Sequence, residues 1–362
     1  MKHITLIAGA RPNFMKVAPI IHAISAAKDD GHALDYCLVH TGQHYDEKMS
    51  GGFFKELNIP EPDANLGAGG GTQAQQTAAI MVGFERHLQD NPTDLVLVVG
   101  DVTSTMACAI VAQKLHTRVA HVEAGIRSND WSMPEEINRL VTDAITNDFF
   151  TTSVVANENL RKSGVVEGRI HFVGNVMIDT LRANEHRLEQ PDVWSELGLA
   201  PQQYLVMTLH RPANVDQEHK LKALIDEIIA HSGDLPMIFP VHPRTAKILN
   251  GLGISHPRLH LVEPLGYLQF NYLVKHAKAV LTDSGGITEE TTVMGVPCMT
   301  LRDNTERPET VTDGTNELIG TDPKAIKPAM EKLFAGDWKQ GGIPEKWDGQ
   351  AARRILEVIL PS

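Results

Sequence analysis

Three carboxylates in the first half of the chain stand where acid–base chemistry on a bound substrate could take place. The apolar run from Asp94 to Asp101 is typical of a buried parallel strand followed by an acid, and a second such run ends at Glu123. A third acid, Glu135, directly follows Pro134, a residue type that often opens a helix. Ligands of open α/β sheets bind beyond the carboxyl ends of the strands, so these acids are candidates for a base and a proton donor. Helix capping and surface salt bridges are the alternative explanation, and capping alone would account for Glu135.

A second group of residues has the pattern of a phosphate site. The expected strand 279–282 is followed by Asp283-Ser284-Gly285-Gly286 and a helix start that carries Glu290 about one turn inside. Glycines let a ligand approach the backbone, and the first helical turn offers N–H groups to an anion. Glu290 would accept hydrogen bonds from the hydroxyls of a ribose. The pattern predicts a nucleotide diphosphate site; a tight strand-to-helix turn without a ligand is the structural alternative.

Cations and histidines at other strand ends could complete this anion site. Arg11 directly follows the first expected strand, and Lys16 lies about one helical turn further on. Arg307 could act in the same way from the second half of the chain. His210 ends a strand at its carboxyl end, where it could bind phosphate or transfer a proton. His242 ends the next strand and is a weaker candidate, because single histidines are more often structural.

These residues are positioned by strands and helices that alternate along the whole chain, which is the pattern of parallel α/β sheets. Helices are expected from just after a loop at Arg11-Pro12 to about residue 27, from 104 to 115, from Pro134 as an amphipathic helix, and from 349 to 360. The expected strands cover residues 3–10, 35–42, 94–100, 118–123 and 170–173 in the first half, and 204–209, 237–241, 259–262, 279–282 and 298–301 in the second.

The alternation restarts near Gly174, which predicts two Rossmann-like domains with parallel sheets that face each other across a cleft. We place the first domain at residues 1–173, joined by the last helix at 348–362, and the second at residues 174–347. The acid candidates then belong to the first domain and the phosphate pattern to the second. The glycine-rich segment 67–71 has neither the lysine nor the preceding strand of a P-loop, so we expect a loop there.

Composition excludes several classes of protein. The 362 residues carry a formal net charge of −12, which argues against a broad nucleic-acid-binding or anionic-membrane-binding surface. No apolar run approaches the ~20 residues of a membrane-spanning helix. The three cysteines lie in apolar contexts without a CxxC spacing, so we expect free thiols in a reducing cytoplasm. The 17 histidines form no recognisable zinc motif with the cysteines, so no metal site is expected.

Five motifs, in this order along the chain, resemble the non-hydrolysing UDP-N-acetylglucosamine 2-epimerases. They are Gly9-Ala-Arg-Pro, His121-Val-Glu-Ala-Gly-Ile-Arg127, Met133-Pro-Glu-Glu-Ile-Asn-Arg139, Asp283-Ser-Gly-Gly-Ile-Thr-Glu-Glu290 and Glu306-Arg-Pro-Glu309. The resemblance implies an enzyme of the isomerase class with a GT-B fold, a nucleotide bound in the cleft, and a homodimer. It also implies that neither a metal nor a nicotinamide cofactor takes part, and that the product serves surface polysaccharide synthesis.

The resemblance also assigns roles. Elimination of UDP from the sugar gives a glycal intermediate, and re-addition inverts C2 to give UDP-N-acetylmannosamine. Asp101, Glu123 and Glu135 are then the acid–base candidates, with no assignment of a carboxylate to a face of C2. His210 and Lys16 would stabilise the departing UDP. The UDP-binding set would be Arg11, Leu265, Phe270, Ser284, Gly285, Gly286, Glu290 and Arg307, with Phe270 and the backbone near Leu265 at the uracil.

One segment departs from the best-known bacterial members, which use it to bind a second substrate molecule. Gln43 and His44 are retained and, with His242, are the candidates for such an allosteric site, but Asp46 is a departure and no arginine follows in segment 65–69. The form Thr-Gly-Gln-His-Tyr-Asp in residues 41–46 is similar to relatives that epimerise UDP-2,3-diacetamido-2,3-dideoxy-glucuronate.

Four alternatives remain open at this point. The substrate could be the diacetamido-glucuronate, or the enzyme could hydrolyse its product to free N-acetylmannosamine. A GT-B glycosyltransferase would also have a nucleotide-binding turn in its second domain, but it would not need three acids in the first. A UDP-sugar sensor would bind without turnover.

Overall fold

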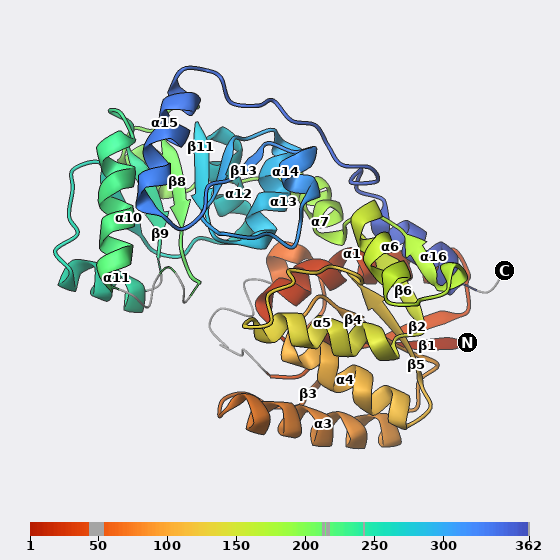
Figure 1. The fold of residues 1–362 in the computed structure, drawn as a ribbon. Helices are drawn as coiled ribbons and strands as arrows, with labels where there is room; N and C mark the ends of the chain where they lie inside the picture. Colours follow the sequence, from red (N-terminus) through yellow and green to blue (C-terminus); the bar gives the residue numbers. More distant parts are fainter. Residues whose placement is uncertain (43–53, 212–213, 215–217, 242, 361–362) are drawn as a thin grey trace. The chain divides into compact units, whose positions relative to one another are not determined.

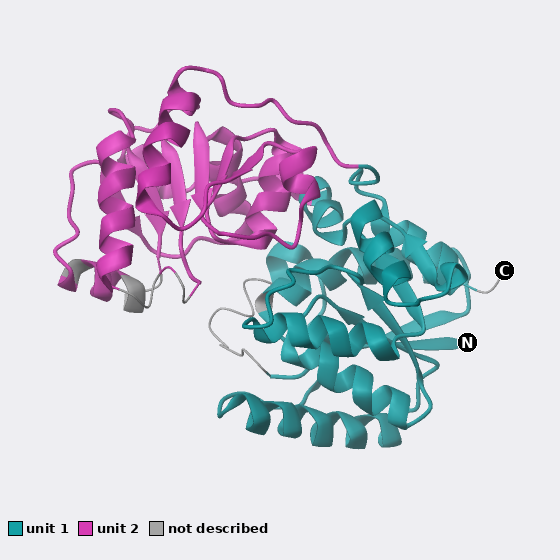
Figure 2. Ribbon diagram, in the orientation of Figure 1, with its two compact units in different colours: residues 1–183, 345–362 teal, residues 184–344 magenta. Residues whose placement is uncertain are grey.

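The fold consists of two compact units, each built on its own parallel sheet. The computed structural model describes residues 1–42, 54–211, 214, 218–241 and 243–360. Unit 1 comprises residues 1–183 and 345–362, and unit 2 comprises residues 184–344 (Figure 2). The predicted class, two Rossmann-like domains with parallel sheets, is confirmed.

Unit 1 contains, within the described residues, a seven-stranded parallel sheet in the order β3-β2-β1-β4-β5-β6-β7 (Figure 1). Its strands are β1 (Lys2–Ala8), β2 (Leu34–His40), β3 (Ala64–Asn65), β4 (Leu95–Val99), β5 (Arg118–Val122), β6 (Asp148–Thr151) and β7 (Ile170–Phe172). Its helices include α1 (Arg11–Asp29), α3 (Gln73–Asp90), α4 (Thr103–Lys114), α5 (Pro134–Ile145), α6 (Val154–Lys162), α7 (Val176–Asn184) and α16 (Ala351–Ile359). The central strand β4 is apolar and buried along its whole length, as expected of a sheet covered on both faces.

Unit 2 contains, in the part of the chain that is described, a six-stranded parallel sheet in the order β10-β9-β8-β11-β12-β13. The strands are β8 (Leu205–Thr208), β9 (Met237–Pro240), β10 (Leu259–Val262), β11 (Ala279–Thr282), β12 (Cys298–Thr300) and β13 (Asn316–Leu318). The helices include α8 (Asp192–Glu196), α10 (Glu218–His231), α11 (Pro243–Gly251), α12 (Tyr267–His276), α13 (Gly285–Met294), α14 (Glu309–Thr312) and α15 (Ile326–Phe334).

The sequence pattern missed three short strands. β3 has two residues and β13 three, and both lie at sheet edges, where little side-chain burial is required. β6 has four residues, of which Phe149 and Phe150 are fully buried. It follows α5 after a two-residue gap, so its apolar pair was too short to stand out as a separate element. All ten predicted strands are present, with ends that differ by up to two residues.

Helix α5 forms at the predicted Pro134, but its buried face is polar. Glu136, Asn138, Arg139, Thr142 and Asp143 are buried, whereas Ile137 is 36% exposed. Buried charges are costly unless they are paired and hydrogen-bonded. The polar face of α5 therefore points to specific partners in the rest of unit 1, which are described below.

The chain crosses from unit 1 to unit 2 after Ala183 and returns at Glu345, about ten residues after the crossing expected near Gly174. Helix α7 stays with unit 1 because the Thr180 hydroxyl donates to the carbonyl of Met15 at 2.6 Å. Asp179, also on α7, accepts the N–H groups of Ala351 and Ala352 at 3.0 and 2.7 Å and so caps α16. Burial raises the pKa of Asp179 to about 6.

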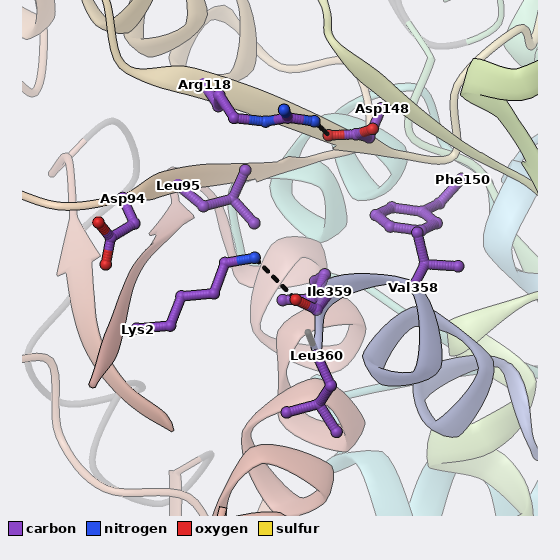
Figure 3. Close-up of a pocket in the computed structure, with 9 residues that line it drawn as sticks. All are labelled: Lys2, Asp94, Leu95, Arg118, Asp148, Phe150, Val358, Ile359 and Leu360. Carbon is purple, nitrogen blue, oxygen red and sulfur yellow. Dashed lines mark hydrogen bonds and ion pairs between the residues drawn. The ribbon is translucent and has the colours of Figure 1, made fainter. Parts of the chain in front are cut away.

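A pocket of about 290 Å³ lies at the edge of the unit 1 sheet where strands β1, β4, β5 and β6 begin (Figure 3). Lys2 donates to the carbonyl of Ile359 at 2.7 Å there, and Arg118 pairs with Asp148 at 2.8 Å. Lys2 thereby satisfies an end carbonyl of α16, an arrangement that the helix dipole favours. The pocket is at the amino ends of the strands, whereas Asp101 and Glu123 follow the carboxyl ends of β4 and β5.

Two of the cysteines, Cys108 and Cys298, are buried free thiols as expected, but Cys37 is only partly buried. In the described part of the chain, no helix combines the length and the apolar character needed to cross a membrane.

Candidate active site

In each sheet the strand order reverses at one pair of neighbouring strands, and Asp101, His210 and Ser284 come after strands of these pairs. The switch lies between β1 and β4 in unit 1 and between β8 and β11 in unit 2. Connections leave such a pair toward opposite sides and open a crevice at the carboxyl ends. In unit 1 the crevice is shaped by Asn13, whose side-chain oxygen accepts the N–H groups of Gly9 and Ala10 and whose amide donates to the carbonyl of Val99.

Asp101 stands at this edge, separated from β4 by Gly100, and its carboxylate is held by an arginine. Its side chain is 25% exposed. Nε and Nη2 of Arg139 donate to its Oδ2 at 3.1 and 2.5 Å, and the amide of Asn138 donates to its backbone carbonyl at 2.8 Å. Two donors on one guanidinium restrict the rotation of the carboxylate. Asp101 is therefore oriented before any substrate binds.

Glu123 follows β5 directly and pairs with Lys16 of α1. Its Oε2 lies 2.7 Å from the Lys16 ammonium, and both side chains are at least nine-tenths buried. Glu123 has a φ of 70°, in the left-handed region that a non-glycine residue seldom adopts and that stores strain. The Lys16 ammonium would lie 2.8 Å from a Cβ at Gly100, so it also packs against the residue before Asp101. The structure thus brings Lys16, Asp101 and Glu123 to one edge.

Glu135 lies in the first turn of α5, partly exposed, and its neighbour Glu136 is buried and holds the preceding loop. Glu136 accepts the N–H and hydroxyl of Ser128, both at 2.9 Å, and the N–H of Asn129 at 3.1 Å. Burial opposes its charge, but these bonds and the one from Arg139 hold the pKa of Glu136 below its ordinary value. Arg139 therefore bridges Glu136 and Asp101 and fixes the start of α5 relative to β4.

In unit 2, the predicted phosphate turn forms the start of helix α13. Ser284 is the N-cap residue, but its side chain makes no capping hydrogen bond, and Gly285 and Gly286 form the first turn. A Cβ at Gly285 would lie 3.3 Å from the guanidinium of Arg307, which is 6% exposed. Arg307 also donates to Glu289 through Nε. A helix N-terminus with an arginine against it is a suitable anion site.

His210 follows β8 at the same switch point and is oriented by Asp283. Asp283 Oδ1 lies 2.8 Å from Nδ1 of His210, whose side chain is 62% exposed. The carboxylate also accepts the backbone N–H groups of His210 and Arg211 and the amide of Asn214. Burial opposes the charge, yet these donors hold the pKa of Asp283 below its ordinary value. With Nδ1 engaged, Nε2 is the nitrogen that remains for a ligand.

Of the predicted ribose and uracil residues, Phe270 lies on α12, Glu290 lies on α13, and Leu265 precedes α12 by two residues. Glu290 is buried and receives a 3.4 Å hydrogen bond from Asn271. Burial raises the pKa of Glu290 to about 7. Phe270 and Leu265 are partly buried and pack on the core that includes Tyr204, so each retains some exposed surface.

Four predicted residues are only partly described or not described. Gln43, His44 and His242 lie outside the described residues. Arg11 follows β1 as predicted but begins α1, where a loop was expected, and its side chain is not among those described.

Sequence analysis assigned no role to Arg139, Glu136 or Asp283, although all three lie in the motifs it used. Their burial is the signal that distinguishes them: each is at most 3% exposed. On α5 the spacing of Glu136, Arg139 and Asp143 by three and four residues puts three charges on one helical face. This spacing can be read from the sequence alone, and it indicates a buried charged face on the helix.

Comparisons with known proteins agree with this architecture. The family described as UDP-N-acetylglucosamine 2-epimerase matches residues 26–360. The UDP-N-acetylglucosamine 2-epimerase of Methanocaldococcus jannaschii is 39% identical over 98% of both chains. A crystal structure from that organism, in complex with UDP-GlcNAc and UDP, has a TM-score of 0.89 and covers 99% of each chain. A UDP-2,3-diacetamido-2,3-dideoxy-D-glucuronate 2-epimerase of Pseudomonas aeruginosa is 37% identical over 99% of both chains.

The archaeal structure matches this chain over nearly its whole length, and this chain has two parallel sheets. Both findings agree with the expected GT-B fold. The chain therefore belongs to the UDP-N-acetylglucosamine 2-epimerase family.

Proposed function

We propose that this chain is a non-hydrolysing UDP-N-acetylglucosamine 2-epimerase that interconverts UDP-GlcNAc and UDP-ManNAc. The observation that carries the proposal is the edge of unit 1 where Asp101 and Glu123 follow neighbouring strands and are each held by a cation. Inversion at C2 requires removal of a proton from one face and return of a proton to the other. Two carboxylates fixed at one edge supply a base and a donor without reorganisation.

The proposed reaction begins with loss of UDP. A carboxylate removes the C2 proton, the C1–O bond to the diphosphate breaks, and the electron pair of the C2–H bond becomes the C1–C2 double bond of 2-acetamidoglucal. Addition of a proton to the opposite face of C2 and return of UDP to C1 give the epimer. Asp101, Glu123 and Glu135 are the groups for the proton transfers. UDP leaves as an anion, so it needs cationic and N–H donors at the diphosphate.

The UDP would be bound by unit 2. The N-terminus of α13 at Ser284–Gly286 and Arg307 suit the diphosphate, and His210, held at Nδ1 by Asp283, would donate from Nε2 in its protonated form. Glu290 suits the ribose hydroxyls, and Phe270 offers a flat apolar surface to the uracil. Homodimerisation and a role in surface polysaccharide synthesis belong to the same proposal and rest on the family resemblance.

One experiment separates this reaction from its alternatives. The purified chain is incubated with UDP-GlcNAc in D2O, and the anomeric and C2 proton signals are followed by NMR. UDP-ManNAc with deuterium at C2 is the expected product. Free N-acetylmannosamine and UDP would instead identify a hydrolysing enzyme. Binding without solvent deuterium at C2 would favour a glycosyltransferase or a sensor.

A second substrate is favoured by a specific observation. The Pseudomonas aeruginosa relative, named for UDP-2,3-diacetamido-2,3-dideoxy-D-glucuronate, is nearly as similar as the archaeal one. If UDP-GlcNAc remains unchanged in D2O, the diacetamido-glucuronate is tested under the same conditions. A ratio of kcat/KM values that favours the uronate would assign the chain to that substrate.

A further inference from the structure

A buried histidine on β5 lies between two hydrogen-bond acceptors. His121 has no exposed surface. Its Nδ1 is 2.8 Å from Oδ1 of Asp143 on α5, and its Nε2 is 2.8 Å from the backbone carbonyl of Gly100. A carboxylate and a carbonyl can only accept hydrogen bonds, while a neutral imidazole carries one N–H. With Asp143 ionised, both contacts are satisfied only if the ring carries a proton on each nitrogen.

Asp143 is the matching anion. Its second oxygen accepts the N–H of Gly125 at 3.1 Å and lies 2.6 Å from Nη1 of Arg127. Burial opposes its ionisation, but the bond and charge of His121 together with Arg127 hold the pKa of Asp143 below its ordinary value. An ionised Asp143 surrounded by donors leaves the second proton on His121.

This ion pair contacts the main chain beside both acid candidates. The Gly100 carbonyl belongs to the peptide bond that leads into Asp101, and Gly125 follows Glu123 by two residues. The backbone here is constrained at Glu123, a non-glycine residue with a φ of 70°. The N–H of Gly100 also donates to the carbonyl of Val122 at 3.0 Å. Conformations of this kind persist only where surrounding contacts determine them.

We propose that His121, doubly protonated and paired with Asp143, is a positioning residue that sets the directions of Asp101 and Glu123 for proton transfer at C2. It does not touch substrate; it acts through the peptides of Gly100 and Gly125. The inference rests on the proposed epimerase function for its kinetic consequences, but not for the protonation of His121.

Two variants test the two hydrogen bonds of the His121 ring separately. In His121→Asn the amide nitrogen takes the place of Nδ1, so the bond to Asp143 can persist and the bond to Gly100 is lost. In His121→Gln the amide nitrogen reaches the place of Nε2, so the bond to Gly100 can persist. We expect kcat to fall about 10- to 100-fold in His121→Asn, as for a small misplacement of reacting groups. His121→Gln should recover part of that loss, with UDP affinity within about twofold of wild type in both.

The matched control is His171→Asn. His171 lies on β7 of the same sheet and faces an aspartate, Asp148, at 3.9 Å, but its neighbours carry no candidate acid. The kcat and KM of the His171→Asn variant should equal those of wild type. Equal losses in His121→Asn and His121→Gln that follow the fall in thermal stability would show that His121 only fills space, and a kcat within twofold of wild type in His121→Asn would also overturn the proposal.

A measurement on the wild-type chain keeps the inference testable even if the variants fold poorly or the substrate is wrong. In protein labelled with ¹⁵N-histidine, the His121 ring signals, assigned by their loss in either variant, should both have the shifts of protonated nitrogens at neutral pH. One protonated and one unprotonated nitrogen would overturn the inference. Failure of wild type to exchange C2 on either UDP-sugar would contradict the proposed function alone.

Discussion

Asp283 is fully buried and lies 2.8 Å from Nδ1 of His210, whose ring is otherwise largely exposed. The carboxylate comes from the residue after β11 and the histidine from the second residue after β8, so the pair joins the two strands of the switch point in unit 2. A histidine fixed at Nδ1 presents Nε2 in a defined direction, which is how carboxylates orient catalytic and metal-binding imidazoles.

We therefore expect Asp283→Asn to lower kcat by about 100-fold. The asparagine amide places an N–H donor where the carboxylate accepted several hydrogen bonds. Steady-state kinetics of a double-mutant cycle with His210→Asn provides the check. If Asp283 acts through His210, the double variant should be little slower than the slower single variant. If the fold losses of kcat in the two single variants multiply in the double variant, the two residues act independently.

Asp101→Asn should reduce turnover by at least about 100-fold and leave UDP binding within twofold of wild type. The change keeps the size of the side chain and removes the charge that a base requires. The control is Asp94→Asn, at the other end of the same strand, where the carboxylate accepts the backbone N–H of His3 at 2.8 Å. Deuterium incorporation at C2 and calorimetric titration with UDP measure the two effects. Near-normal turnover in Asp101→Asn would remove Asp101 from the mechanism.

UDP binding should weaken as the pH falls below about 7. Burial raises the pKa of Glu290 to about 7, and ribose hydroxyls donate best to the ionised carboxylate. Binding then requires loss of a proton, and each pH unit below 7 should raise the Kd by up to about tenfold. The contribution of UDP's own ionisation is removed by comparison with Glu290→Gln, which should bind more weakly at pH 8. Parallel pH profiles for the two proteins would contradict the ribose assignment.

Glu309→Gln should stabilise unit 2 at alkaline pH. Burial raises the pKa of Glu309 from 4.5 to about 7. The folded state holds this proton more tightly than the unfolded state, so the stabilisation is complete below pH 4.5 and is lost as the pH rises through 7. At pH 8 the cost of ionising the buried carboxyl is at most about 3 kcal/mol, and glutamine avoids it. Urea unfolding at pH 5 and pH 8 tests this.

The urea midpoint of Glu309→Gln should exceed the wild-type midpoint at pH 8. At pH 5 the two midpoints should be close to each other. Exposed Glu331 on α15 provides the control, because Glu331→Gln should shift neither midpoint by more than about 0.5 kcal/mol. An equal gain at both pH values would mean that ionisation of Glu309 is not the cause.

The order of the apolar runs was sufficient to predict the two-sheet architecture and the sheet edge at which the candidate residues lie. Apolar runs of four to seven residues must be buried, and parallel strands joined by helices place their carboxyl ends together. Asp101, Glu123, His210 and Ser284 were therefore located correctly relative to their strands from local pattern alone. The short strands β3, β6 and β13 carried too few residues for such a pattern.

Only the tertiary structure decided how these groups are paired. Lys16, which was expected to act at the diphosphate, pairs in the structure with Glu123, 107 residues away in sequence. Arg139 reaches Asp101 across 38 residues, and Asp143 reaches His121 across 22. Such pairs depend on the rotation of α1 and α5 about their axes and on their register against the sheet. A buried charge is stable only where the packing supplies its partner. The polar face of α5 can therefore be explained only together with the strands on which the helix packs.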